Sequence, residues 1–108
     1  MTMTAEDLIE ALELQQHPEG GWYKETFNNR PDDNARGTMT AIYFLLKDGE
    51  TSHWHRVTDA DEVWSWIAGA SLAFSSTSDG KSVDRFKIGM DLASGETPQL
   101  VVKAGDWQ

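Results

Sequence analysis

The stretch that decides the fold is HWHRVTDADEVWSWIAG, residues 53–69. It opens with a His-Trp-His triplet and closes on a glycine. Residues two apart on a β-strand point to the same face of the sheet, so His53 and His55 should share a face. A polar run with two aspartates, residues 56–61, follows and is typical of a connection between strands. We therefore predict a β-hairpin whose first strand carries both histidines.

The second half of this stretch carries a carboxylate and two aromatic side chains at a spacing of two. The same alternation places Glu62, Trp64 and Trp66 on one face of the second strand. The predicted hairpin would then direct imidazole, carboxylate and indole groups toward a single space. We expect the remainder of the chain to form the scaffold that supports this cluster.

Composition narrows the classes of partner. The chain has 108 residues with 9 Lys+Arg against 18 Asp+Glu, a formal net charge of -9. Phosphate binding needs a clustered basic patch, so we expect neither nucleic acid nor a membrane surface as partner. The absence of cysteine excludes disulfides and thiolate chemistry. Residues 1–7 are acidic where a signal peptide would be basic, and we expect a cytoplasmic protein.

The rest of the chain predicts one helix followed by short strands. Thr4 is a suitable N-cap, and we expect the helix to end near Gln16, before Pro18 and a glycine pair. The predicted strands are a short one that follows a turn within residues 17–27, then 38–46, 72–75, 83–88 and 98–102, in addition to the hairpin. The strand 38–46 is apolar on both faces toward its end, and we expect it to be well buried. Regular spacing and Gly turns predict an antiparallel sandwich or barrel.

The histidines and the carboxylate leave three interpretations open. Two imidazoles and a carboxylate suit a divalent metal such as Fe, Mn, Ni or Zn. Without a metal, His55 and Glu62 could act as general base and acid. The third interpretation is structural, with the histidines satisfied by hydrogen bonds inside a barrel. Trp64 and Trp66, with Tyr43 and Trp22, could form an aromatic wall for a ligand, although tryptophans also fill small cores.

The chain resembles a known family over nearly its whole length. Residues 53–69 are similar to the first motif of the cupin superfamily, in which a His-x-His pair is followed by a glutamate and a glycine. The segments HPEGGWYKETF (17–27), TAIYFLL (40–46), DEVW (61–64) and PQLVV (98–102) resemble the cupin_5 (DUF985) branch. The resemblance implies a double-stranded β-helix, a homodimer, and first-motif ligands at His53, His55 and Glu62. The second-motif proline and histidine are replaced by Lys103 and Gln108.

The expected fold is an all-β cupin double-stranded β-helix, or jelly-roll barrel, with one N-terminal helix. We expect residues 1–108 to form a single cupin domain. A barrel of this type continues through further strands after the second motif, so we expect the domain to be truncated at its C-terminal end. An unpaired sheet edge would be left there.

The expected function is the binding of a small molecule in the barrel pocket. If the protein is an enzyme, we expect isomerase or epimerase chemistry with His55 and Glu62 as the acid–base pair. Alternatively, a divalent metal would be held by His53, His55, Glu62 and Gln108. The competing hypothesis is a non-catalytic ligand-binding or sensor module, because a cupin fold alone does not determine an activity.

Overall fold

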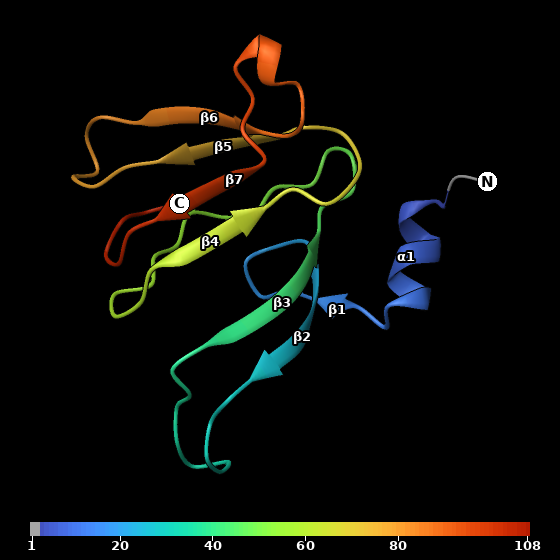
Figure 1. Ribbon diagram of the computed structural model, residues 1–108, viewed down its shortest axis with the longest axis vertical. Coiled ribbons are helices and arrows are strands. Elements are labelled where there is room, and N and C mark those ends of the chain that lie inside the picture. Colours follow the sequence, from blue (N-terminus) through green and yellow to red (C-terminus); the bar gives the residue numbers. More distant parts are fainter. Residues whose placement is uncertain (1–2) are drawn as a thin grey trace. The chain divides into compact units, whose positions relative to one another are not determined.

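The computed structural model describes residues 3–108 and divides into two compact units (Figure 1). The first unit ends at His53 and the second comprises Trp54–Gln108. Strands make up 35% of the structure and there is one short α-helix. The predicted all-β class is therefore confirmed.

Helix α1 (Ala5–Ala11) begins where the sequence predicts. The Thr4 hydroxyl accepts a hydrogen bond from the Asp7 N–H, and the Asp7 carboxylate accepts one from the Thr4 N–H at 2.9 Å. This reciprocal capping box satisfies two N–H groups that the helix leaves unpaired. The Asp7 carboxyl has a lowered pKa because these hydrogen bonds favour its ionised form.

The prediction that α1 extends to near Gln16 is wrong. The chain leaves the helix at Glu13, whose φ of 56° lies in the left-handed region. The Leu14 N–H then donates to the Ile9 carbonyl and the Glu13 N–H to the Glu10 carbonyl, the two bonds of a Schellman motif. Glutamate is an unusual residue at this position, where glycine is the common choice. The end of the helix therefore has no marker in the sequence.

The first unit is built on a three-stranded antiparallel sheet in the order β1-β2-β3. The strands are β1 (Gln15–Gln16), β2 (Trp22–Asn28) and β3 (Thr40–Leu45). Gly20 and Gly21, with φ of 110° and 82°, form the turn between β1 and β2 instead of ending the helix. A left-handed backbone of this kind is accessible mainly to glycine.

The prediction that β3 is well buried is wrong. Ile42 is 45% exposed and Tyr43 is 41% exposed. The strand lies at the edge of its sheet, paired only with β2. Its apolar residues reflect the β-propensity of branched and aromatic side chains, which by itself does not determine whether a second layer covers them.

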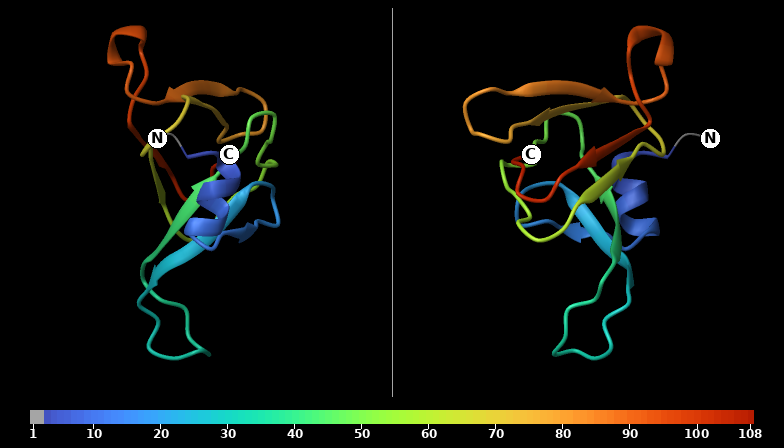
Figure 2. Two further views of the ribbon diagram at one scale, coloured as in Figure 1. Left: turned by 90° about the vertical axis from the view of Figure 1, so that its right-hand side faces the viewer. Right: turned by 60° about the vertical axis from the view of Figure 1, so that its left-hand side comes forward.

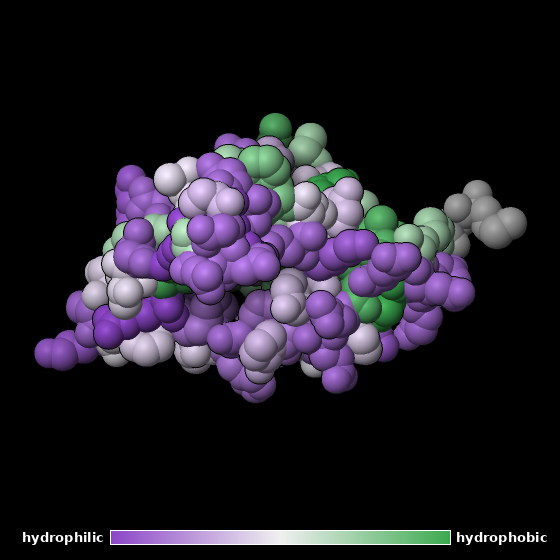
Figure 3. Space-filling view, turned by 90° about the horizontal axis from the view of Figure 1, so that it is seen from below, coloured by the Kyte–Doolittle hydropathy of each residue, from purple (hydrophilic) through white to green (hydrophobic). Residues whose placement is uncertain are grey.

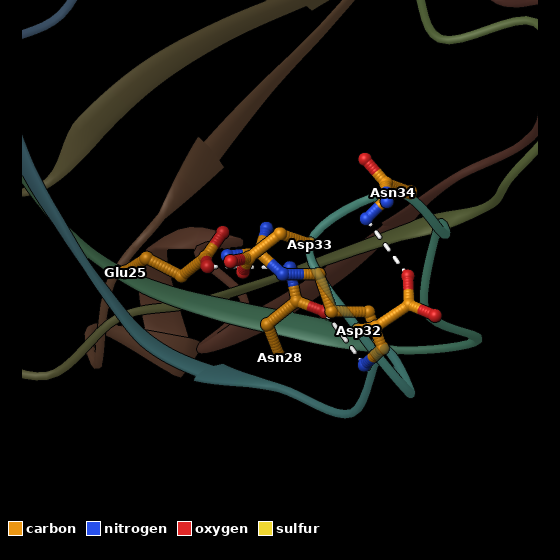
Figure 4. A network of polar contacts seen from close by, with 6 residues as sticks. Glu25, Asn28, Asp32, Asp33 and Asn34 are labelled. Atoms are coloured by element: carbon orange, nitrogen blue, oxygen red, sulfur yellow. Dashed lines mark hydrogen bonds and ion pairs between the residues drawn. The ribbon is translucent and has the colours of Figure 1, made fainter.

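The β2–β3 connection is an exposed loop, and polar side chains hold it in shape (Figure 4). Asn28 donates from its amide to the Glu25 carboxylate and accepts from the Arg30 N–H. Farther along, the Asn34 N–H donates to Asp32 at 2.8 Å. The bonds from the N–H groups of Arg30 and Asn34 are local side-chain-to-backbone bonds of the kind that favour turns. Viewed from below, the surface is mostly hydrophilic (Figure 3).

The second unit consists of two antiparallel strand pairs. Strand β4 (Glu62–Ser65) pairs with β7 (Gln99–Val102), and β5 (Leu72–Ser76) pairs with β6 (Asp84–Ile88) (Figure 2). A 3-10 turn, η1 (Leu92–Ser94), lies in the connection from β6 to β7. Both pairs contribute to one core, formed by the buried residues Phe74, Ile88 and Val102 and flanked by Trp64, Trp66, Leu72 and Leu100.

The prediction that residues 53–69 form a hairpin is wrong. Within the second unit, β4 pairs with β7, and the His55 segment pairs with the end of the chain. The N–H of His55 donates to the Gln108 carbonyl at 3.0 Å, and the N–H of Gln108 returns the bond at 2.9 Å. Residues 99–108 are therefore the shared partner of both halves of the motif. A long connection between two strands does not determine that they pair with each other.

The turn between β5 and β6 is organised by Asp79. Its carboxylate accepts hydrogen bonds from the Thr77 hydroxyl and from the N–H groups of Lys81 and Ser82. These bonds favour the ionised form and lower the pKa of Asp79 from its ordinary value of 3.8. The turn is therefore stabilised by an ionised carboxylate.

This gives a prediction for the pH dependence of stability. A carboxyl whose pKa is lowered by folding stabilises the native state above its unfolded pKa, and that contribution is lost as the pH falls through the folded pKa. Asp79→Asn keeps an oxygen acceptor but has no charge to titrate. We expect the wild type to exceed the variant in free energy of unfolding at pH 7, with the difference shrinking below about pH 3.8. Urea titrations across this range measure it, and a constant difference would contradict the assignment.

Candidate functional site

The residues singled out from the sequence are divided between the two units. Trp22, Tyr43 and His53 belong to the first unit. The second unit contains His55, Glu62, Trp64, Trp66 and Gln108.

In the first unit, Trp22 and Tyr43 lie on the same face of the sheet. Trp22 pairs with Leu45 across the strands, two residues from Tyr43, so the alternation places both on one side. The Lys47 ammonium group lies 5.1 Å from the centroid of the Trp22 ring, a cation–π contact. The His53 N–H donates to the Glu19 carbonyl at 2.7 Å, which ties this end of the unit to the β1–β2 turn.

In the second unit, the strand pairing brings His55 and Gln108 opposite each other. Residues that exchange both backbone hydrogen bonds in an antiparallel pair carry their side chains on the same face. The two bonds between His55 and Gln108 are of this kind. His55 is half-buried and Gln108 is 9% exposed. This neighbourhood depends on contacts between residues far apart in the sequence.

Trp64 extends this cluster through the Gln108 side chain. The Trp64 indole N–H donates to the Gln108 Oε1 at 2.9 Å. Glu62 lies two residues before Trp64 on β4, and both are half-buried, so they share the inward face of the strand. We call the surface formed by His55, Glu62, Trp64 and Gln108 the Gln108 face.

The amide nitrogen of Gln108 is the distinctive feature of this face. An indole nitrogen can only donate, so the bond from Trp64 requires the amide oxygen to point toward it. This fixes the amide nitrogen on the other side. Gln108 Nε2 is buried and has no hydrogen-bond partner among residues 3–108. A buried donor without a partner costs roughly 1–3 kcal/mol.

The two tryptophans of the motif pack against the apolar core of the second unit. The Trp64 ring meets Phe74 edge to face at a centroid distance of 5.4 Å. The Trp66 indole N–H donates to the Ala70 carbonyl at 3.3 Å. Both indoles therefore have a packing function and a satisfied N–H. The role of an aromatic wall for a ligand stays a prediction for them, as it does for Trp22 and Tyr43.

A metal ion needs a convergent set of donors, which the second unit does not assemble by itself. Among the described residues, no group of three or more His, Asp or Glu is placed to hold a metal ion. The Gln108 oxygen already accepts from Trp64, and its amide nitrogen cannot bind a cation. The second unit therefore does not supply a complete donor set for a divalent metal by itself. The four-residue ligand set with His53 stays a prediction.

The turn after β7 is anchored by the loop that precedes β4. The Asp61 carboxylate accepts from the Ala104 N–H at 2.8 Å and lies 3.8 Å from the Lys103 ammonium group. The Gly105 N–H donates to the Val57 carbonyl. These contacts hold the segment 103–108 in place, and with it the side chain of Gln108.

Comparison with known proteins identifies the family. The model of the Cupin_5 family, described as Cupin superfamily (DUF985), matches residues 6–108. The chain belongs to the Cupin_5 family. The predicted cupin fold is thereby confirmed.

Two solved structures of similar fold support this assignment. A protein from Shewanella oneidensis, determined by X-ray crystallography, is 41% identical with a TM-score of 0.89, over 98% of this chain and 67% of that one. A hypothetical protein from Leishmania major is 30% identical with a TM-score of 0.84, over 97% of this chain and 68% of that one. No curated protein matches the sequence. No helix within residues 3–108 is long and apolar enough to cross a membrane.

Gln108 has a structural role that the sequence does not indicate. The cupin motif suggests that it replaces a histidine ligand, whereas the structure makes it the neighbour of His55 and the acceptor of Trp64. Its polar side chain next to a tryptophan gives no signal of burial. Only the pairing of residues 55 and 108 reveals it.

Proposed function

We propose that this Cupin_5 protein binds a small molecule at the Gln108 face through a carbonyl or carboxylate oxygen. The observation that carries the proposal is the buried Gln108 Nε2, a donor without a partner among the described residues. A ligand oxygen would supply the missing acceptor and recover the free energy that the unpaired donor costs. Trp64 holds the amide in the required orientation.

Gln108 shares its face with groups suited to acid–base chemistry. His55 lies opposite Gln108 in the antiparallel pairing, and Glu62 is on the inward face of β4. Imidazole and carboxylate groups are the usual residues that transfer protons to and from a bound substrate. The finer proposal is therefore an isomerase or epimerase reaction, with His55 as base and Glu62 as acid partner, on a proton next to the bound carbonyl. We also propose that the protein forms a homodimer, as the family resemblance implies.

The test compares ligand-induced thermal stabilisation in matched variants. The probes are a panel of 2-oxo and 2-hydroxy carboxylates and aldoses, all of which carry oxygen acceptors. A ligand at 100 times its Kd stabilises the native state by about 2.7 kcal/mol, so at least one probe should raise the Tm of the wild type by several degrees. Gln108→Leu should lose this shift because it removes the donor.

Gln99→Leu is the matched control. Gln99 is exposed on β7 and donates to the Ser65 hydroxyl at 3.1 Å, away from the Gln108 face. This variant should keep the wild-type shift. Equal shifts in all three proteins, or no shift with any probe, would contradict the proposal. For a probe that binds, NMR in D2O would then follow deuterium exchange next to its carbonyl, which the acid–base proposal predicts for the wild type but not for His55→Ala.

A further inference from the structure

The second unit has a cleft on the face of the sheet opposite to His55 and Gln108. It has a volume of about 340 Å³ and is lined by Trp54, Thr77, Gly80, Val83 and Trp107. This volume lies in the range of small-ligand sites. All of these residues belong to the second unit.

The pairing of the strands explains why this cleft is separate from the Gln108 face. Trp107 bridges Arg56 on one side and Thr77 on the other, so these three side chains form one row across three strands. His55 and Gln108 are the sequence neighbours of Arg56 and Trp107, and alternation directs them to the opposite face. Two faces of the same short ribbon therefore carry two different sets of groups.

The tryptophans of the cleft are unusually exposed for their size. Trp54 is 53% exposed and Trp107 is 36% exposed. Trp64 and Trp66, in contrast, are half-buried and pack against the core. At Gly80 a Cβ would meet nothing within 4 Å, so the cleft is open beside this residue. Indole surfaces beside an open space favour a planar ring.

Arg56 adds a positive charge beside the cleft. Its guanidinium group lies 4.9 Å from the centroid of the Trp107 ring. Among the described residues, it is within ion-pair distance of no carboxylate, although the chain as a whole has a net charge of -9. A guanidinium stacked on an aromatic ring keeps its N–H edge available for a bidentate contact with a carboxylate.

The Asp79 carboxylate, which adjoins the cleft, is engaged in its own turn. Asp79 adjoins Gly80, but its oxygens accept bonds from Thr77, Lys81 and Ser82 within its own turn. We propose that the Trp54–Trp107 cleft is a second binding site, which takes a planar aromatic carboxylate. The ring lies against the indoles, and the carboxylate pairs with Arg56.

The experiment uses 2-naphthoate as probe and isothermal titration calorimetry as the measurement. Trp54→Ala should weaken the binding of 2-naphthoate roughly tenfold or more, because the stacking of its ring on an indole is lost. Arg56→Gln should weaken naphthoate roughly tenfold, while binding of the uncharged 2-naphthalenemethanol should change little. Gln108→Leu should bind naphthoate like the wild type, which separates this site from the one proposed above.

Arg85→Gln is the charge-matched control. Arg85 lies on β6 and lines a different cleft of the same unit. Unchanged naphthoate binding in this variant is expected, and far-UV circular dichroism confirms that each variant is folded. No saturable binding to the wild type, or weakening by Arg85→Gln but not by Trp54→Ala, would overturn the proposal. So would a dimer of the wild type that Trp54→Ala dissociates, because the cleft would then be an interface between two copies.

Discussion

Replacing Gly21 with alanine is expected to destabilise the protein by about 2–4 kcal/mol. Gly21 is buried and has a φ of 82°. A Cβ there would lie 2.6 Å from the Phe44 ring and 2.8 Å from Leu46, closer than carbon atoms can approach. The variant therefore adds a steric overlap within the core of the first unit to the cost of a left-handed alanine. Urea unfolding followed by circular dichroism measures the loss.

Gly49→Ala separates the two contributions. Gly49 has a nearly identical φ of 85°, but a Cβ at this position would meet nothing within 4 Å. Only the backbone contribution remains, and we expect a loss of about 1–2 kcal/mol. If both variants lost the same free energy of unfolding, close packing at Gly21 would not be the cause.

Replacing Ile88 with alanine is expected to cost about 2–5 kcal/mol. Ile88 is 2% exposed and lies in the core that β4, β5, β6 and β7 share. Truncation removes buried methyl groups and leaves a cavity between Phe74 and Val102, which the neighbouring strands can close only in part. The measurement is again the free energy of unfolding in urea.

Ile67→Ala provides the matched control for this prediction. Ile67 is 76% exposed, so the same change of side chain buries nothing and opens no cavity. We expect a change within about 0.5 kcal/mol. A loss as large as that of Ile88→Ala would show that Ile67 is covered in solution, for example by a second copy of the chain.

Local features of the fold could be predicted from the sequence. Thr4 was correctly identified as the cap of α1, because capping depends on residues within one turn. The alternation of Glu62 and Trp64 correctly predicted a shared face, since the period of a strand is a local property. The strand at 72–76 was likewise predicted within one residue.

Features that depend on distant contacts could not be predicted in this way. The end of α1 depends on a left-handed Glu13, a residue type that rarely adopts this conformation. The expected hairpin failed because His55 pairs with Gln108 and β4 with β7, which no turn signal between residues 56 and 61 indicates. The candidate site could not be predicted in full for the same reason, because Gln108 lies beside His55 only through that pairing.

The pairing of residues 99–108 with both β4 and His55 also bears on the order of events during folding. In the first unit, the contacts between β1, β2 and β3 join segments that are close in the sequence, and such contacts form quickly. The second unit needs residues 55 and 108 to meet, which requires closing a much longer loop. A chain synthesised only as far as residue 98 therefore contains His55 and β4 but not the residues with which they pair. Until residues 99–108 are available, Trp64 and Phe74 lack the strand that completes their core, and their apolar surface stays exposed.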